Sequence, residues 1–178
     1  MIYLLSDNNY FALGVKALLL SKGYAVKQID EEAITDADVD SSNTLILSVS
    51  DLSVMRKILR CARNLKVIVF LDVRRDFRHF HLGNWTICSR RDAGMISGIL
   101  KCYHYSDAHQ YLTFSQKGIL LQLSTGKTIG QVAKEMSISE KTVSAHKIHG
   151  LLKLGINRSN RMLLAVLYMI IVESRCIA

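Results

Sequence analysis

The stretch TIGQVAKEMSISEKTVSAHKIHGLLKLG, residues 128–155, decides how the carboxy-terminal third of the chain folds. It opens with Thr128, a hydroxyl residue, and an amide residue, Gln131, follows three positions later. A hydroxyl and an amide at this spacing form a capping box at the amino end of a helix. Ser139 is a second N-cap, and it predicts a further helix that runs to about Leu154. Two helices joined by the short turn before Ser139 have the geometry of a helix-turn-helix.

The second of these helices has a distinct outer face. If Val143 points inward, the helical step of about 100° per residue also turns Gly150 and Leu154 inward. The residues that then face outward are Lys141, Ser144, Ala145, Ile148 and His149. His146 falls at the edge of this face, and Lys147 and Lys153 fall on its flanks, where they could reach phosphates. Short side chains at the start of the helix would let it approach base edges in a DNA major groove.

The residues around this unit extend the helical pattern. Thr113 and Gln116 repeat the capping pair and predict a helix that ends before Gly126. Ser159-Asn160 predicts the start of a fourth helix after the helix-turn-helix. We therefore expect an all-α carboxy-terminal domain of four helices.

The ungapped stretch Leu112–Val166 resembles the LuxR/FixJ/NarL-type DNA-binding domain. The segments at the expected spacings are Leu112-Thr113, Gly126-Lys127-Thr128, Val132-Ala133, Ile138–Val143, His146-Lys147 and Lys153-Leu154-Gly155. Gln116 departs from the usual Glu but keeps the capping role. Gly150 replaces a usual aliphatic residue, which we expect to loosen the packing by ~1 kcal/mol.

The helical pattern and the resemblance together predict a double-stranded DNA partner and a set of DNA contacts. The predicted contact residues are Thr128, Lys134, Ser139, Lys141, Thr142, Ser144, Ala145, His146, Lys147, Ile148 and Lys153. The charge distribution agrees with a polyanionic partner. Residues 112–178 carry nine Lys/Arg and three Asp/Glu, a balance of +6, whereas residues 1–111 carry 14 and 12, a balance of +2.

The first hundred residues alternate between short apolar runs and helical segments, which favours an open parallel α/β sheet of five strands. The expected strands are Ile2–Leu5, Ala25–Ile29, Thr44–Val49, Val67–Leu71 and Trp85–Cys88. Helices are expected over Tyr10–Leu20, from an Asp51 cap to about Asn64, and from an Asp92 cap to Lys101. The polar, aromatic segment 103–111 is expected to link a domain over 1–102 to one over 112–178.

Regulators of this family often carry a receiver domain that accepts a phosphate on an aspartate, and residues 1–102 resemble its topology. That chemistry needs two acids after the first strand to hold Mg²⁺ and an Asp at the end of the third strand. This sequence has only Asp7 at the first place and Ser48 at the second. We expect a degenerate receiver with Ser48 at the lost phosphorylation site and Asp7 as the residual acid. Asp51 could be a displaced acceptor, but a helix N-cap is the favoured interpretation.

The apolar run Met162–Val172 is too short to span a membrane, which needs about 20 residues. It either packs under the receiver-like domain or forms a subunit interface, and the resemblance favours the interface. The predicted interface residues are Met162, Leu163, Val166, Leu167 and Ile170. The chain would then act as a homodimer or as a heterodimer with another LuxR-type protein.

No pattern for catalysis stands out in the sequence. The pair His79-x-His81 has no third ligand close in sequence, so we expect no metal site, no cofactor and no enzyme activity. With no visible signal peptide, a cytoplasmic location is expected. The leading hypothesis is a sequence-specific transcription regulator that is not switched by aspartyl phosphate. The alternatives are an accessory subunit that acts by pairing with another LuxR-type regulator, and a true phosphorelay receiver.

Overall fold

The computed structural model of this chain describes residues 1–34, 42–62, 65–72, 80–82, 85–102, 112–154, 156, 166 and 169. The chain divides into two units, one within residues 1–109 and one from residue 110 onwards. The linker expected over 103–111 lies outside the described residues.

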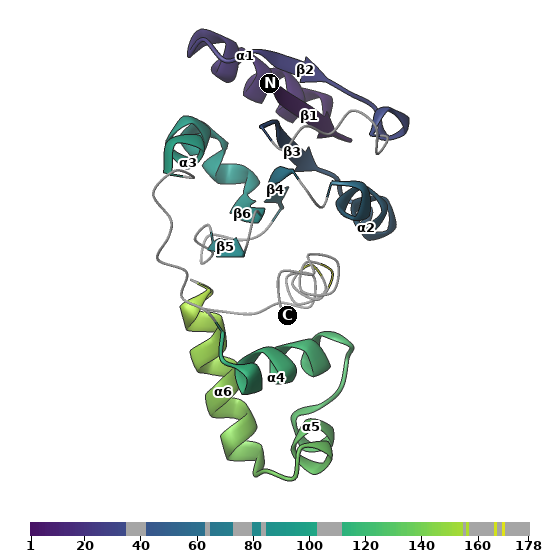
Figure 1. Ribbon diagram of the computed structural model, residues 1–178, viewed down its shortest axis with the longest axis vertical. Coiled ribbons are helices and arrows are strands. Elements are labelled where there is room, and N and C mark those ends of the chain that lie inside the picture. Colours follow the sequence, from purple (N-terminus) through teal and green to yellow (C-terminus); the bar gives the residue numbers. More distant parts are fainter. Residues whose placement is uncertain are drawn as a thin grey trace. The chain divides into compact units, whose positions relative to one another are not determined.

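The amino-terminal unit is built on a sheet with the strand order β2-β1-β3-β4-β6-β5 (Figure 1). The strands are β1 (Ile2–Ser6), β2 (Val26–Gln28), β3 (Thr44–Ser48), β4 (Lys66–Leu71), β5 (Phe80–Leu82) and β6 (Trp85–Ser89). All strands except β5 pair in parallel, which confirms the predicted five-stranded parallel sheet. Strands β3 and β6 are buried along their whole length, as expected for a sheet with both faces covered.

The sheet also has an antiparallel edge strand that the sequence did not predict. Strand β5 pairs with β6, with Phe80 opposite Ile87 and Leu82 opposite Trp85. A strand of three residues is too short to give a readable alternation of apolar and polar positions. The available signal was the dipeptide Gly83-Asn84 between the two strands, which is typical of a hairpin turn.

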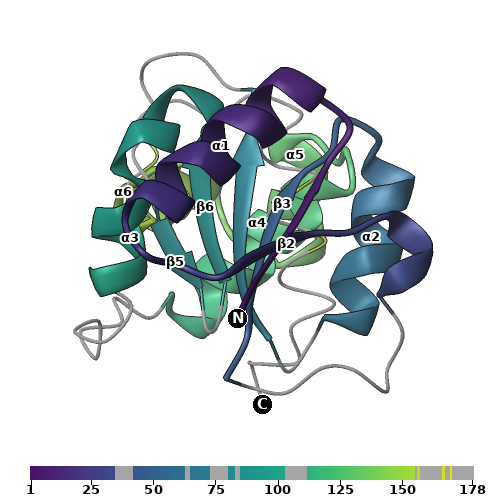
Figure 2. The ribbon, with the colours of Figure 1, turned by 90° about the horizontal axis from the view of Figure 1, so that it is seen from above.

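Helices α1 (Asn9–Ser21) and α3 (Ile96–Cys102) share one face of this sheet, and α2 (Leu52–Cys61) lies on the other side (Figures 1 and 2). The core between the sheet and helices α1 and α3 is mainly aliphatic. Its buried residues are Ile2, Leu4, Ala12, Val15, Leu19, Ile46, Ile68, Phe70, Cys88, Ile96 and Ile99. Two short 3₁₀ helices, η1 (Glu31–Ala33) and η2 (Arg90–Met95), complete the unit.

The helix caps in this unit were predicted in part. Asp51 is the N-cap of α2 and accepts hydrogen bonds from the backbone N–H groups of Ser53 and Val54, which confirms the favoured interpretation of this residue. The prediction for the last helix was wrong, because Ser89 caps η2 by accepting from the Arg91 N–H. Asp92 therefore lies inside η2 instead of preceding a helix.

The carboxy-terminal unit contains α4 (Phe114–Ser124), α5 (Ile129–Glu135) and α6 (Glu140–Lys153). Both predicted capping boxes are present, one from Thr113 and Gln116 and one from Thr128 and Gln131. The three helices share a core of Ile119, Leu123, Val132, Ala133 and Val143. The fourth helix predicted after Ser159-Asn160 lies largely outside the described residues.

Gly150 brings α6 close to α4. It is buried, and a Cβ at this position would lie 3.1 Å from Leu120 Cδ1 and 3.5 Å from Gln116 Cβ. An aliphatic side chain here would require the Leu120 side chain to shift by a few tenths of an ångström. The expectation that glycine loosens this packing stays a prediction.

Candidate functional site

The turn between α5 and α6 sets the angle at which α6 leaves the unit. Ser137 takes the left-handed conformation, with φ of 55°, and the Ile138 N–H donates to the Ala133 carbonyl at 3.0 Å. Ile138 then packs against the unit's core. The Glu140 side chain at the start of α6 also reaches α5, since a Cβ on Gly130 would lie 2.9 Å from Glu140 Oε1. The turn is thus fixed by backbone and packing contacts at both ends.

The face of α6 that turns away from the core is close to the predicted one. Val143, Gly150 and Leu154 are buried, and the residues exposed on the opposite side include Lys141, Ala145, Ile148 and His149. Ile148 is an exposed large apolar side chain, at 54%. Ser144 and His146 are half-buried. Leu151 is a buried position that the sequence pattern did not predict.

Several predicted contact residues already hold the helix ends. The Ser139 hydroxyl accepts from the Thr142 N–H at 3.0 Å and lies 2.8 Å from Thr142 Oγ1. Thr128 Oγ1 accepts from the Gln131 N–H at 3.3 Å. These two hydroxyl groups therefore cap the amino ends of α5 and α6. Backbone N–H groups at a helix amino end attract anions.

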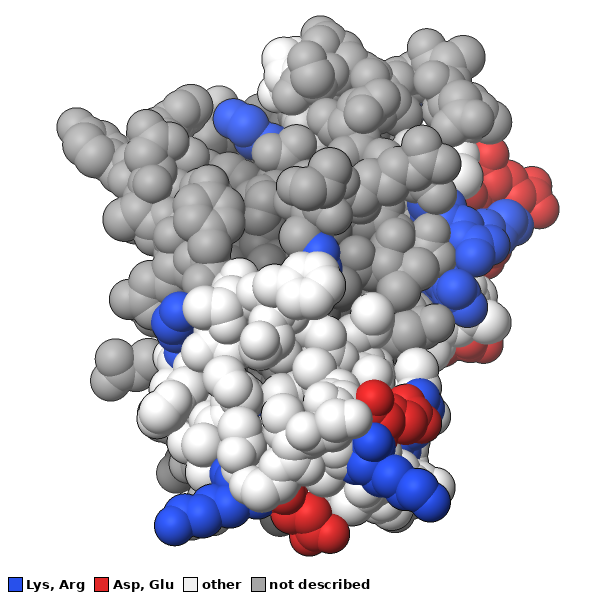
Figure 3. Space-filling view, turned by 60° about the horizontal axis from the view of Figure 1, so that its bottom comes forward, with Lys and Arg blue, Asp and Glu red and all other residues white. Residues whose placement is uncertain are grey.

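Lysines surround this face. Lys134, Lys141 and Lys153 are exposed, and Lys147 is half-buried. Lys127 forms an ion pair with Glu135. In the lower part of Figure 3, blue cationic side chains border a mostly uncharged surface, with red acidic side chains among them. The unit thus combines an uncharged strip with cations at its sides, an arrangement that suits a nucleic-acid backbone on either side of a groove.

Residues 110–167 match the family described as bacterial regulatory proteins, luxR family. The match covers the described helices α4, α5 and α6 in full. These residues are similar to the luxR-family domain. The resemblance found in the sequence is confirmed at this level, and the helix-turn-helix described above lies within the matched residues.

Three comparisons of the whole chain with solved structures give weaker likenesses. The RcsB response regulator of Salmonella typhimurium is 17% identical, with 94% of this chain and 97% of that one covered and a TM-score of 0.39. RcsB from Salmonella enterica serovar Typhimurium bound to the promoter P1flhDC is 16% identical, with 98% of each chain covered and a TM-score of 0.44. The response regulator ChrA of a heme-sensing two-component system is 16% identical, with 99% and 98% covered and a TM-score of 0.32. No curated protein matches the sequence significantly.

In the amino-terminal unit, an arginine fills the space at the carboxyl ends of three strands. Arg90 directly follows β6, and its Nε donates to Ser48 Oγ, at the end of β3, at 2.7 Å. Its Nη2 donates to Asp7 Oδ1, just after β1, at 3.1 Å and to the Ser48 carbonyl at 3.3 Å. The guanidinium also lies 5.8 Å from the centroid of the Phe11 ring. We call Arg90, Ser48 and Asp7 the arginine clamp.

The clamp is mostly shielded from solvent. Ser48 is fully buried, and the side chain of Arg90 is 18% exposed and that of Asp7 is 38% exposed. Partial burial acts to raise the pKa of Asp7. It is outweighed by hydrogen bonds from Ser50, whose N–H donates to Asp7 Oδ2 at 2.6 Å, and by the charge of Arg90. The net effect is a pKa below the ordinary value, so Asp7 is held as a carboxylate.

Sequence reasoning placed Asp7 and Ser48 at strand ends but did not bring Arg90 to them. By sequence alone, the pair Arg90-Arg91 is expected on a solvated rim, with phosphate or an acidic neighbour as the alternative partner. The missing signal was positional. An arginine directly after a strand, in a parallel sheet whose neighbouring strands end in Asp7 and Ser48, can reach both across the same sheet edge.

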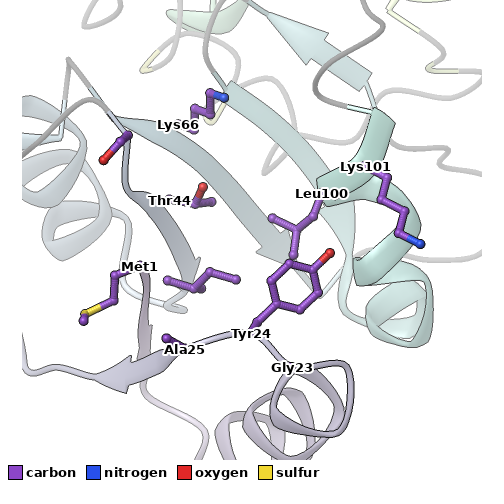
Figure 4. Close-up of a pocket in the computed structure, with 10 residues that line it drawn as sticks. Met1, Gly23, Tyr24, Ala25, Thr44, Lys66, Leu100 and Lys101 are labelled. Carbon is purple, nitrogen blue, oxygen red and sulfur yellow. The ribbon is translucent and has the colours of Figure 1, made fainter.

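A cavity of about 380 Å³ lies at the opposite, amino-terminal edge of the sheet, beside Tyr24, Thr44, Lys66 and Leu100 (Figure 4). The Tyr24 ring extends toward Leu100, whereas the Lys101 side chain points away. Lys101 lies in the last turn of α3, where the carbonyl end of the helix favours a cation. The partial negative charge at the carboxyl end of α3 therefore accounts for a lysine at this position.

The remaining predicted sites fall mainly outside the described residues. Of the predicted interface, Met162, Leu163, Leu167 and Ile170 lie there, and Val166 is buried within the single chain. The side chains of His79 and His81 are likewise outside the description. Within the described ranges, no group of three or more His, Cys, Asp or Glu could hold a metal ion. No helix in the part of the chain that the structure describes is long and apolar enough to cross a membrane.

Proposed function

We propose that this chain is a sequence-specific transcription regulator in which α6 lies in the DNA major groove. The observation that carries this proposal is the luxR-family domain over residues 110–167, in which the outer side of α6 is not used for packing. Ala145 and Ile148 are exposed there and would contact thymine methyl groups. The half-buried Ser144 would read an adjacent base edge.

Phosphate contacts would come from the sides of the same helix and from the helix amino ends. Lys141 is exposed in the first turn of α6, Lys134 at the end of α5 and Lys153 at the end of α6. The capped amino ends at Thr128 and Ser139 would present backbone N–H groups to phosphates. These contacts position the protein and carry little sequence information, whereas the short side chains between them would select the bases.

The test is selection of bound duplexes from a random DNA library with the full chain, followed by affinity measurements on the enriched sequence. We expect one enriched motif and a loss of about 1–3 kcal/mol of binding free energy for Ala145→Asp. Ala33→Asp, at an exposed alanine in η1 of the other unit, is the matched control and should bind normally. Normal operator binding by Ala145→Asp would show that α6 is not the recognition helix.

We further propose that the amino-terminal unit is a degenerate receiver. The arginine clamp supports this, because Ser48 stands at the end of β3, is fully buried and is bonded to a guanidinium. A serine cannot form an acyl phosphate. The donor set also does not suit Mg²⁺, since the carboxylate of the clamp, Asp7, is already paired with a cation. Regulation would then come from protein abundance, a partner or a ligand.

A further inference from the structure

The cavity of about 380 Å³ at the amino-terminal edge of the sheet is built on the first residues of three neighbouring strands. Ile2 of β1 pairs with Thr44 of β3, and Thr44 pairs with Lys66 of β4. Residues in one such row point to the same face of a sheet. Ile2 belongs to the core between the sheet and helices α1 and α3, so the row lies on the face that these helices cover. The base of the cavity therefore combines an apolar, a hydroxyl and a cationic side chain.

The ends of α1 and α3 complete the cavity. Helix α1 is followed by a turn at Gly23, which has a φ of 81°, and the Tyr24 N–H donates to the Leu19 carbonyl at 3.1 Å. The Tyr24 ring packs against the core and extends toward Leu100 of α3 (Figure 4). Backbone and packing contacts thus hold this part of the wall in place. Binding of a ligand would need little further ordering there, which favours affinity.

The polar groups of the cavity favour a ligand that accepts hydrogen bonds. Thr44 is only 9% exposed, and its hydroxyl has no hydrogen-bonding partner among the residues that the structure describes. The ammonium group of Lys66 is a donor without acceptor capacity. No Asp or Glu is found among the described residues that line the cavity. A negatively charged oxygen atom next to Thr44 and Lys66 would match this set of groups.

The size and the charge of the cavity narrow the class of ligand. Its volume lies near the lower end of the range of about 300–1,000 Å³ for ligand pockets, which favours a small molecule. The carboxyl ends of α1 and α3 carry partial negative charge, and Lys101 in the last turn of α3 offsets part of it. These helix ends disfavour a phosphate ester, which carries nearly two negative charges, more than a carboxylate, which carries one.

We propose that this cavity binds a small organic acid with one carboxylate group on an apolar body. The carboxylate binds Lys66 and Thr44, and the apolar body packs against Leu100 and the Tyr24 ring. This inference rests on the proposed function where it concerns DNA, and it names a ligand class for the regulation proposed there. Leu100 lies in the last turn of α3, and the residues that match the luxR family begin at 110. The acid would therefore contact the last described helix before the DNA-binding unit in the sequence.

The experiment is isothermal titration calorimetry of the full chain without DNA. The probes are phenylacetate and hexanoate, which place a carboxylate on an aromatic and on an aliphatic body. At least one of them should give a saturable isotherm with one site per chain. The amide of that acid should bind at least about tenfold more weakly, because it lacks the charge that pairs with Lys66. Phenyl phosphate should bind more weakly than phenylacetate.

Two variants test the residues that hold the carboxylate. Lys66→Gln should weaken binding of the acid at least about tenfold, and Thr44→Val, which keeps the shape of the side chain, should weaken it about threefold. Lys27→Gln is the matched control, because Lys27 is an exposed lysine of the neighbouring strand β2 and is not among the residues that line the cavity. It should bind like the wild type.

Hydrogen exchange of the wild type locates the site without any substitution. The bound acid should slow exchange in peptides over residues 22–28 and 96–102 and should leave α4, α5 and α6 unchanged. The proposal is overturned if neither acid binds, if the amide or Lys66→Gln binds as tightly, if phenyl phosphate binds more tightly, or if other peptides alone are protected. Neither measurement uses DNA, so failure of this site and failure of DNA binding are read separately.

Discussion

At the scale of single residues, the arginine clamp makes stability depend on pH. The folded pKa of Asp7 lies below the value of 3.8 that it takes when unperturbed. Its stabilising effect is therefore complete above about pH 5 and is lost as the pH falls through the folded pKa. Between about pH 5 and pH 3, the free energy of unfolding should fall further for the wild type than for Asp7→Asn, by about 1 kcal/mol or less because Asp7 is partly exposed. Urea titrations at several pH values measure this difference.

Removing the other half of the clamp has a larger effect. Arg90→Met leaves Asp7 without a cation and Ser48 Oγ without its shortest hydrogen bond, which is 2.7 Å in the wild type. We expect a loss of about 1–3 kcal/mol at neutral pH. Arg91→Met, at the exposed neighbouring residue, serves as the control. Equal stability of the two variants in urea would show that the clamp contributes nothing to folding.

Gly150 gives a second prediction at this scale. Gly150→Ala adds a Cβ 3.1 Å from Leu120 Cδ1, so the Leu120 side chain must give way in a packed interface, and we expect a loss of about 1–3 kcal/mol. Gly118→Ala is the matched change, because it lies in α4 with no atom within 4 Å of its new Cβ. It should gain about 0.5–1 kcal/mol from helix propensity alone. Thermal unfolding of both variants gives the comparison, and stabilisation by both would contradict the close packing of α6 on α4.

At the scale of elements, salt can separate the phosphate contacts from the base contacts that we propose for α6. Lys147→Ala should weaken binding to specific and random DNA about equally and should lower the slope of log K against log salt by ~1, because the role proposed for this lysine is a phosphate contact. Lys22→Ala, at the exposed C-cap of α1, should leave the slope unchanged. Fluorescence anisotropy at several salt concentrations measures both. A normal slope for Lys147→Ala would place this lysine away from the DNA backbone.

The elements were predictable wherever a local pattern determined them. The buried strands and the capping boxes depend on neighbouring residues, so Thr44–Val49 and the pair Thr128 and Gln131 could be read directly from the sequence. Strand β5 could not, because its three residues are held by pairing with β6. The arginine clamp was missed for a related reason, since Arg90 and Asp7 are 83 positions apart and meet only through the order of the strands.

At the scale of the whole molecule, the proposed absence of a phosphate switch is tested with a small phosphodonor. Acetyl phosphate and Mg²⁺ should give no covalent phosphate on the chain and no change in operator affinity, because Ser48 stands at the acceptor place and Asp51 is engaged as the N-cap of α2. Intact-mass spectrometry and anisotropy provide the two measurements. Phosphate on Asp51 in stoichiometric amount would contradict the proposal and would make this residue a displaced acceptor.

The arginine clamp also bears on how this unit could change during evolution. Restoring an aspartate at Ser48 alone would place a new carboxylate within reach of the Arg90 guanidinium, which is 2.7 Å from Ser48 Oγ. That carboxylate would form a buried ion pair, which is costly to break. Ser6, next to Asp7, supplies no second acid. A return to phosphate signalling would thus require coordinated changes at Ser6, Ser48 and Arg90, and each single step would bring no gain in activity. If the unit is a degenerate receiver as proposed, the clamp would make the loss of that chemistry hard to reverse.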